Sequence, residues 1–133
     1  GFSAPAPDEQ VALQLGLGER VARLERQRLA DGVIMAYEVS MLPESVVPEP
    51  EAVGVSLYTY LAQTGHVPAR ALQHIRALNA DGKLAALLEI ETGTAVLFIT
   101  RVGYLESGKA IELTHSYCRS DYYDFVTELR REG

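Results

Sequence analysis

Two arginines separated by a single residue are the most informative chemical feature of the sequence. Arg26 and Arg28 fall within Glu19 to Leu29, where residue character alternates and predicts a β-strand. Residues two apart in a strand point to the same face, which here also carries Ala22 and Leu24. Guanidinium groups on a partly apolar face need partners, either protein carboxylates or an anionic ligand that the planar fork of arginine can hold. The pattern leaves both alternatives open.

Glu38 is the first candidate partner, and its face depends on the register of a hairpin. It lies in Val33 to Met41, a predicted return strand after the turn Ala30-Asp31-Gly32. A three-residue loop pairs Leu24 with Glu38 and places Glu38 on the arginine face. A two-residue Asp31-Gly32 turn places it on the opposite face. Both registers agree with the sequence.

Glu112 is the second candidate, in a second predicted hairpin. It stands between Ile111 and Leu113 on the strand Ala110 to Arg119, which follows a turn at residues 106 to 109. A lone glutamate in an apolar strand is typical of an ion-pair partner. The other interpretation is a general acid or base.

Ser56 precedes a predicted helix from Leu57 to Gln63 that Gly65 closes. A serine at this position caps the helix by accepting a backbone hydrogen bond. The free N–H groups and the helix dipole also favour an anion there, so Ser56 has a structural and a ligand-binding interpretation.

Searches for catalytic and metal motifs give nothing that predicts such a site. The three histidines show neither i,i+4 spacing nor a cysteine partner, and phosphate-loop, dinucleotide and nucleophile-elbow patterns are absent from the sequence. We therefore expect no metal and no cofactor. Cys118 beside Arg119 is either an activated thiol or inert packing.

Composition and charge restrict the class of protein further. The 133 residues are 47% hydrophobic and 23% charged, which suits one globular domain. The net charge of −6 argues against a DNA- or RNA-binding surface, because the one dense basic stretch, residues 20 to 28, is interrupted by Glu25. No apolar run is long enough to span a membrane, no signal peptide is evident, and there is one cysteine. We expect a cytoplasmic protein without a membrane partner.

The other predicted elements complete an α+β pattern. Residues 1 to 7 are expected to be a tail or linker stub, and residues 43 to 54 a loop. A nearly unbroken apolar run in Thr94 to Tyr104 predicts a central strand covered on both faces. The remaining expected elements are a helix Glu9 to Leu15 capped by Asp8, a strand Val67 to Leu78, a helix Gly82 to Leu88 capped by Asp81, and a helical or mixed segment Asp121 to Arg131.

A repeated pattern of elements divides the chain into two similar halves. A helix followed by a hairpin occurs once from residue 8 and again from residue 81. Two such helix-plus-hairpin units predict one antiparallel sheet with helices packed on one side. A cleft between two similar halves is a natural ligand site.

The ordered set of motifs resembles the UTRA domain, the effector-binding half of bacterial GntR-type transcription regulators of the HutC subfamily. Residues 21 to 32 read VARLERQRLADG and are similar to the R-x-R-x-A-D-G hairpin of that family. Further agreement follows in order at Glu38 with residues 41 to 43, at residues 56 to 58, at 96 to 101, at 111 to 112 and at 117 to 123.

The resemblance implies a chorismate lyase-like α+β fold and a sensor role. It implies a domain from residue 8 to 133, preceded in relatives by a winged helix-turn-helix domain that binds operator DNA and that this chain lacks. It also implies a homodimer in which effector binding changes the affinity for the operator.

The resemblance further implies an effector site. In the amino-sugar-phosphate sensors of the family, positions matching Arg26, Arg28 and Ser56 help to hold the phosphate, and positions matching Glu38 and Glu112 meet sugar hydroxyls. This favours the register with Glu38 on the arginine face. Tyr117 completes the expected effector-binding set, and Cys118 departs from the family where a bulky residue often faces the ligand.

We therefore expect a non-enzymatic effector-binding and dimerisation domain of a transcription repressor, with an anionic metabolite such as a sugar phosphate as its ligand. Two alternatives remain: a lyase on the same scaffold, with Glu112 as its acid or base, and a purely structural dimerisation module.

Overall fold

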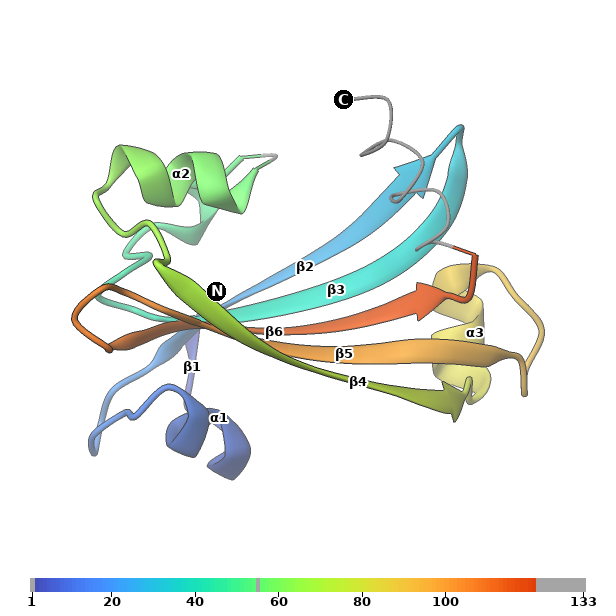
Figure 1. The fold of residues 1–133 in the computed structure, drawn as a ribbon, viewed down its shortest axis with the longest axis horizontal. Coiled ribbons are helices and arrows are strands. Elements are labelled where there is room, and N and C mark those ends of the chain that lie inside the picture. Colours follow the sequence, from blue (N-terminus) through green and yellow to red (C-terminus); the bar gives the residue numbers. More distant parts are fainter. Residues whose placement is uncertain (1, 55, 122–133) are drawn as a thin grey trace.

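The computed structural model describes residues 2–54 and 56–121, which form a single antiparallel sheet with short helices on both of its faces (Figure 1). The sheet has six strands in the order β1-β2-β3-β6-β5-β4. The strands are β1 (Phe2–Ser3), β2 (Val21–Ala30), β3 (Val33–Pro43), β4 (Arg70–Asn79), β5 (Ala95–Tyr104) and β6 (Ala110–Arg119), and the helices are α1 (Pro7–Ala12), α2 (Leu57–Gln63), α3 (Gly82–Leu88) and a 3₁₀ turn, η1 (Pro50–Ala52).

The two predicted helix-plus-hairpin halves are confirmed. Helix α1 leads into the β2–β3 hairpin, and α3 leads into the β5–β6 hairpin. The halves meet where β3 and β6 pair antiparallel at the middle of the sheet. None of the helices in the described part of the chain is long and apolar enough to cross a membrane.

Helices α1 and α3 pack on the same face of the sheet, as the repeated helix-plus-hairpin pattern predicts. Leucines after α1 and within α3 cover separate parts of this face, which carries the odd-numbered residues of β2. The buried side chains there are Leu13, Leu15, Val21, Met41 and Leu113 near α1, and Leu84, Ala85, Leu88 and Val96 near α3.

Helix α2 lies on the other face, which we call the arginine face because it carries Arg26 and Arg28. Figure 1 shows α2 above the sheet and α1 below it. Leu57 and Leu61 of α2 pack on Ala22 and Leu42 at one end of the arginine face. This end is sealed by apolar side chains, and the polar residues begin farther along β2 and β3.

A β-bulge decides which residues share the arginine face. The turn is the two-residue form, with Asp31 and Gly32 at φ 50° and 77°, and it pairs Ala30 with Val33. A register shift between Arg28 and Leu29 leaves one extra residue on β3. As a result, Arg26 lies directly opposite Glu38. The pairing of Leu24 with Glu38 is wrong, but the bulge brings Glu38 to the arginine face.

The N-terminal residues depart from the prediction. Phe2 and Ser3, expected in a tail, pair with β2, and α1 begins at Pro7 and ends at Ala12. Its N-cap is Ala6, so the cap expected at Asp8 is wrong. The Glu9 carboxylate accepts a hydrogen bond from the Ala6 amide at 3.0 Å, which moves the helix start towards the N-terminus.

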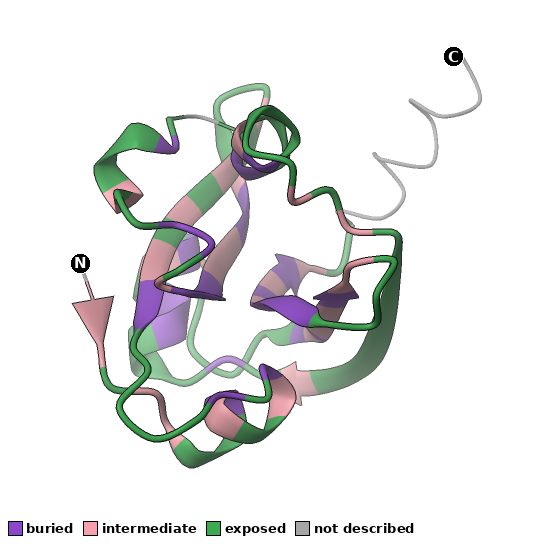
Figure 2. Ribbon diagram, turned by 90° about the vertical axis from the view of Figure 1, so that its left-hand side faces the viewer, coloured by how far each residue is buried: buried purple, intermediate pink, exposed green. Residues whose placement is uncertain are grey.

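The coverage predicted for the apolar strand is also wrong. β5 lies one strand in from the edge, and in its apolar run Val96 and Ile99 are buried while Ala95 is exposed. Helix α3 covers only the start of β5, and β4 beside it is exposed along nearly its whole length (Figure 2). The segment expected from Asp121 to Arg131 falls outside the described residues after its first position.

An ion pair fixes α1 to the sheet. The Glu9 carboxylate accepts hydrogen bonds from Arg23 of β2 at 2.8 and 3.0 Å. Burial alone would raise the pKa of Glu9, but the hydrogen bonds from Arg23 and Ala6 hold it below its ordinary value. The charged form of Glu9 therefore stabilises the fold.

The substitution Glu9→Gln is expected to lower the free energy of unfolding at pH 7 by about 1–3 kcal/mol, the scale of a charged hydrogen bond. Because the pKa of Glu9 is lowered in the fold, this contribution is present above the unfolded pKa of about 4.3 and is lost as the pH falls through the folded pKa. Urea denaturation at several pH values should show the difference shrinking below about pH 4. An equal difference at pH 7 and pH 3, or an equal loss in the exposed control Glu19→Gln, would contradict this role.

Candidate functional site

The first part of the site is an arginine–glutamate–serine chain across three neighbouring strands. Nε of Arg28 donates to Oε1 of Glu38 at 2.6 Å, and the Ser116 hydroxyl donates to Oε2 at 2.8 Å. The Arg28 side chain is 41% exposed, whereas that of Glu38 is 18% exposed. Glu38 is thus held from both sides, and Arg28 still reaches solvent.

Arg26 stands beside this chain, directly opposite Glu38 in the β2–β3 ladder. It is partly buried, and burial lowers the pKa of Arg26, with the neighbouring positive charge of Arg28 lowering it further. For Glu38, burial would raise the pKa, but hydrogen bonds from Arg28 and Ser116 and the charges of both arginines hold it low. The pKa values of Arg26 and Glu38 therefore each depend on the charges beside them.

A second cluster surrounds Glu112, whose side chain is 0% exposed. Its carboxylate accepts hydrogen bonds from Arg101 at 2.9 Å, from the Tyr58 hydroxyl at 2.9 Å, and from the Thr114 hydroxyl. The Arg101 guanidinium also lies 5.1 Å from the centre of the Tyr58 ring. Tyr58 belongs to α2, so this cluster joins the helix to β5 and β6.

The Glu112 carboxylate changes the pKa of two of its hydrogen-bond donors, Arg101 and Tyr58. Burial would lower the pKa of Arg101, but the charge and hydrogen bond of Glu112 raise it above its ordinary value. Burial and the Glu112 carboxylate both raise the pKa of Tyr58, which keeps its hydroxyl protonated as a donor. Nε of Arg101 is buried and has no hydrogen-bond partner among the described residues.

Gly103 makes room for the buried carboxylate. It pairs with Glu112 across the β5–β6 ladder, and a Cβ atom built on it would lie 2.9 Å from Oε1 of Glu112. Such a contact is shorter than van der Waals distance, and Pro68 closes the same space at 3.6 Å. A Cβ atom at residue 103 would therefore displace the Glu112 carboxylate from the position where it receives its three hydrogen bonds.

The two clusters form one polar surface. Ser40 and Thr114 lie between them and share a hydrogen bond of 2.8 Å. Three arginines, at 26, 28 and 101, face two glutamates, at 38 and 112, which leaves one excess positive charge. The chain as a whole carries −6, so this local excess runs against the average.

The structure brings together Arg26, Arg28, Glu38 and Glu112 on the arginine face, with α2 packed at the same end of the sheet as Glu112. The predicted cap is confirmed, because Ser56 Oγ accepts a hydrogen bond from the Thr59 amide at 3.2 Å. The anion-binding role of Ser56 stays a prediction.

Tyr117 does not join the other predicted residues. It lies on the opposite face of the sheet, since Ser116 and Cys118 point to the arginine face and residues alternate along β6. Its ring stacks on Phe98 at 4.8 Å and on Tyr37 at 6.4 Å between centroids.

Cys118 is packing and not an activated thiol. It is buried with Ala36 and Ile99, and burial followed by the charge of Glu38 raises the pKa of Cys118 to about 11. Its neighbour Arg119 pairs instead with Asp121 at 3.0 Å. The interpretation as a reactive cysteine is wrong.

Sequence reasoning missed four residues of this surface: Tyr58, Arg101, Thr114 and Ser116. Thr114 and Ser116 could have been found, because they lie two and four residues after Glu112 on one strand and share its face. Arg101 faces Thr114 only through the register shift at Gly103, which no local pattern reveals.

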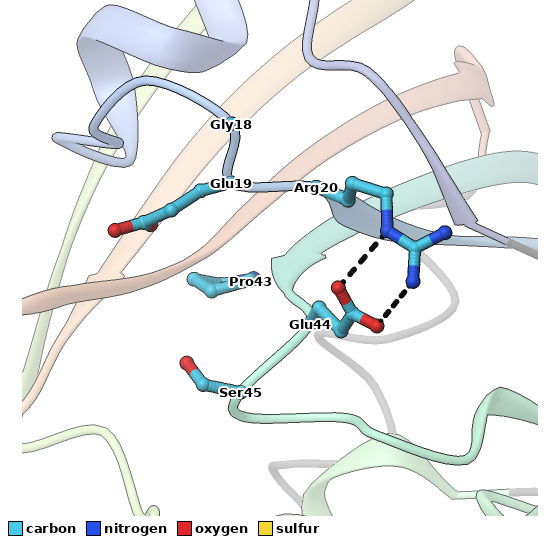
Figure 3. A pocket seen from close by; sticks show the side chains of 6 residues that line it. All are labelled: Gly18, Glu19, Arg20, Pro43, Glu44 and Ser45. Carbon is cyan, nitrogen blue, oxygen red and sulfur yellow. Dashed lines mark hydrogen bonds and ion pairs between the residues drawn. The ribbon is translucent and has the colours of Figure 1, made fainter.

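A surface groove lies elsewhere on the molecule. It has a volume of about 460 Å³ and is lined by residues 18–20 and 43–45 (Figure 3). Arg20 and Glu44 form a two-fold hydrogen-bonded ion pair in it and neutralise each other, with distances of 2.6 and 3.0 Å. Residues 2–54 and 56–121 contain no group of three or more histidine, cysteine, aspartate or glutamate side chains that could hold a metal ion.

The sequence matches the model of the UTRA domain over residues 2–124. It is 32% identical to the HTH-type transcriptional regulator GgaR of Escherichia coli over 122 residues, which is 90% of this chain and 49% of that protein. It is 33% identical to the HTH-type transcriptional repressor NagR of Bacillus subtilis over 128 residues, 92% of this chain and 53% of that protein.

The fold is similar to a crystal structure of the effector domain of PhnF from Mycobacterium smegmatis. The TM-score is 0.85 at 27% identity, with 92% of this chain and 77% of that chain covered. The chain spans about half the length of the curated relatives it matches. Both of these relatives are transcriptional regulators.

The substitution Gly103→Ala is expected to displace the Glu112 carboxylate and to lower the free energy of unfolding by about 1–3 kcal/mol, because a buried charged group then loses hydrogen bonds. Urea denaturation measures the loss. Gly82→Ala is the matched control, since nothing lies within 4 Å of its added Cβ and Gly82 begins a helix, where alanine is favoured. Equal stability of the two variants would show that Gly103 does not hold Glu112 in place.

Proposed function

The chain belongs to the UTRA domain family, the effector-binding part of GntR-family transcription regulators, and from that premise we propose that its effector is an anionic metabolite such as a sugar phosphate. The binding surface is the arginine face, with Arg26 and Arg28 as its centre. Bound there, the effector changes the operator affinity of a DNA-binding domain attached to this one in a cytoplasmic homodimer.

The observation that carries the proposal is that Arg26 and Arg28 share one face of the sheet, where the Arg28 side chain is 41% exposed and reaches solvent. Burial and the positive charge of Arg28 lower the pKa of Arg26, while the charges of Glu38 and Glu112 act against that shift. An anion placed between the two arginines acts against it in the same way. The planar guanidinium forks suit phosphate or carboxylate oxygens, which accept two parallel hydrogen bonds.

The two glutamates have different roles in this proposal. Glu38 is 18% exposed and lies between the arginines and Ser116, so it can accept a hydrogen bond from a ligand hydroxyl. Glu112 is fully buried and already receives three hydrogen bonds. We therefore assign Glu112 to positioning Arg101 and Tyr58, in place of the direct ligand contact that the family resemblance implies.

The connection between ligand and helix gives the proposal a route to regulation. The Tyr58–Glu112 hydrogen bond and the apolar contacts of Leu57 and Leu61 hold α2 against the sheet. A ligand that binds better to one arrangement of α2 and the sheet shifts the population towards it. This differential affinity is what couples effector binding to the attached DNA-binding domain.

Two alternatives lead to different results with added metabolites. A lyase would convert its ligand, but the matched relatives are transcriptional regulators. A purely structural module is favoured by the Arg28–Glu38 ion pair, which satisfies both groups without any ligand. Such a module would show no ligand-dependent stabilisation.

A panel of sugar phosphates, with the matching neutral sugars as controls, is expected to raise the melting temperature only for phosphorylated members, because ligands that prefer the folded state stabilise it. For the best ligand, Arg26→Ala should weaken binding by about 2–5 kcal/mol in calorimetry, the scale of truncating one partner of a desolvated charge pair.

The matched control is Arg20→Ala, which removes an exposed arginine already paired with Glu44. It should leave affinity unchanged. Equal affinity in Arg26→Ala and the unmodified chain would remove Arg26 from the site, and a panel without any stabilising anion would favour the structural module.

A further inference from the structure

The face of the sheet opposite the arginine face carries a groove beside α3. Its floor is formed by Tyr37, Val39 and Tyr117 of β3 and β6, and one of its walls by Leu84 and Leu87 of α3. We call it the aromatic groove. Its volume is about 330 Å³. Small-molecule sites are mostly apolar clefts of roughly 300 to 1,000 Å³ with a few polar groups, so the aromatic groove is of a size to hold one small ligand.

The floor of the aromatic groove belongs to a row of stacked rings. Tyr37, Tyr117 and Phe98 lie opposite one another on β3, β6 and β5. The ring centroids of Phe98 and Tyr117 are 4.8 Å apart with planes at 23°, and those of Tyr37 and Tyr117 are 6.4 Å apart with planes at 27°. The first distance matches the spacing of neighbouring strands. The rings therefore stack along the sheet and turn their edges away from it.

Ring edges that point out of a sheet favour one kind of ligand. The edge of an aromatic ring carries partial positive charge and its face partial negative charge, so rings attract one another edge to face. The protein makes such a contact between Phe98 and His115, whose centroids lie 5.4 Å apart at an interplanar angle of 67°. A planar aromatic molecule lying parallel to the sheet would place its face over the edges of Tyr37 and Tyr117.

Tyr117 also offers a hydrogen bond to such a ligand. The Tyr37 hydroxyl donates to Glu25 at 2.8 Å, whereas the Tyr117 hydroxyl takes part in no hydrogen bond within residues 2–54 and 56–121. Burial and the charge of Asp81 raise the pKa of Tyr117, which keeps this hydroxyl protonated. It is therefore free to donate to an acceptor atom in the groove.

The charges around the aromatic groove favour a ligand without net charge. Among the described residues, the charged side chains that line it are Asp81 and Lys83, which have opposite signs. An anion attracted by one is repelled by the other, and the same holds for a cation. The aromatic groove differs in this respect from the arginine face, where positive charge is in excess.

We propose that the aromatic groove is a second ligand site of this domain, and that it binds an uncharged planar aromatic molecule carrying a hydrogen-bond acceptor. The ligand lies between the leucines of α3 and the ring edges of Tyr37 and Tyr117, and accepts a hydrogen bond from the Tyr117 hydroxyl. The site does not depend on the proposed effector site, because it lies on the other face of the sheet and no arginine lines it.

An NMR titration of the full chain with benzamide tests the site. Benzamide is planar, aromatic and uncharged, and its carbonyl oxygen accepts hydrogen bonds. Saturable shifts are expected for the ring signals of Tyr37 and Tyr117 and for the methyl signals of Leu84 and Leu87. Cyclohexanecarboxamide keeps the amide but has no aromatic face, so it should bind at least fivefold more weakly. Benzoate, which adds a negative charge, should bind the groove no more tightly than benzamide.

Two variants test the residues of the aromatic groove. Leu87→Glu puts a charge into the apolar wall at a half-buried position and is expected to abolish the binding of benzamide. Leu17→Glu is the matched control, since Leu17 is 98% exposed, and it should bind normally. Tyr117→Phe keeps the ring and removes the hydroxyl, so it should weaken binding about two- to tenfold, the scale of one hydrogen bond.

Several results would overturn the proposal. They are equal affinities for benzamide and cyclohexanecarboxamide, shifts confined to the arginine face, and unchanged binding in Leu87→Glu. If Leu87→Glu does not keep the circular dichroism spectrum of the unmodified chain, Tyr117→Phe decides, and unchanged affinity there overturns the proposal.

Arg26→Ala separates this site from the proposed effector site. It should weaken the binding of a phosphorylated ligand and leave the affinity for benzamide unchanged. Weaker benzamide binding in this variant would place benzamide on the arginine face and would contradict a second site. If benzamide binds in the groove but no anion binds the arginine face, the second site stands and the effector proposal fails.

Discussion

Positive charge on a partly dehydrated sheet face is the constraint on which the rest of this structure depends. Three guanidinium groups lie on the arginine face, and two carboxylates compensate for them. Each carboxylate is held by further donors, Ser116 for Glu38 and Tyr58 with Thr114 for Glu112. The incomplete compensation is what the proposed anion site depends on. Because Tyr58 belongs to α2, the same charges also hold a helix against the sheet.

Local signals were sufficient to predict several elements. The bounds of α2 and α3 follow from their caps, since Ser56 and Asp81 each accept a hydrogen bond from an amide three residues later. The two hairpins follow from alternation and turn residues. The register of the first hairpin could not be predicted, because its bulge adds a residue that only the packing of the whole sheet selects.

In the candidate site, too, some features could be predicted from the sequence and others depend on the three-dimensional packing. Arg26, Arg28 and Glu38 share a face, as the family resemblance implies, but Tyr117 lies on the other side of the sheet. Strand parity with Glu112 would have excluded Tyr117. Arg101 and Tyr58 come from segments far apart in the chain, and their meeting at Glu112 depends on Gly103, whose role appears only in three dimensions.

The most direct test of the account is an NMR titration of the arginine Nε–Hε groups with inorganic phosphate, compared with chloride at the same ionic strength. The account predicts saturable shifts for Arg26 and Arg28, with Arg20 and Arg70 unchanged as internal references. Equal shifts for all four arginines, or larger shifts for the two references, would contradict an anion site on this face of the sheet.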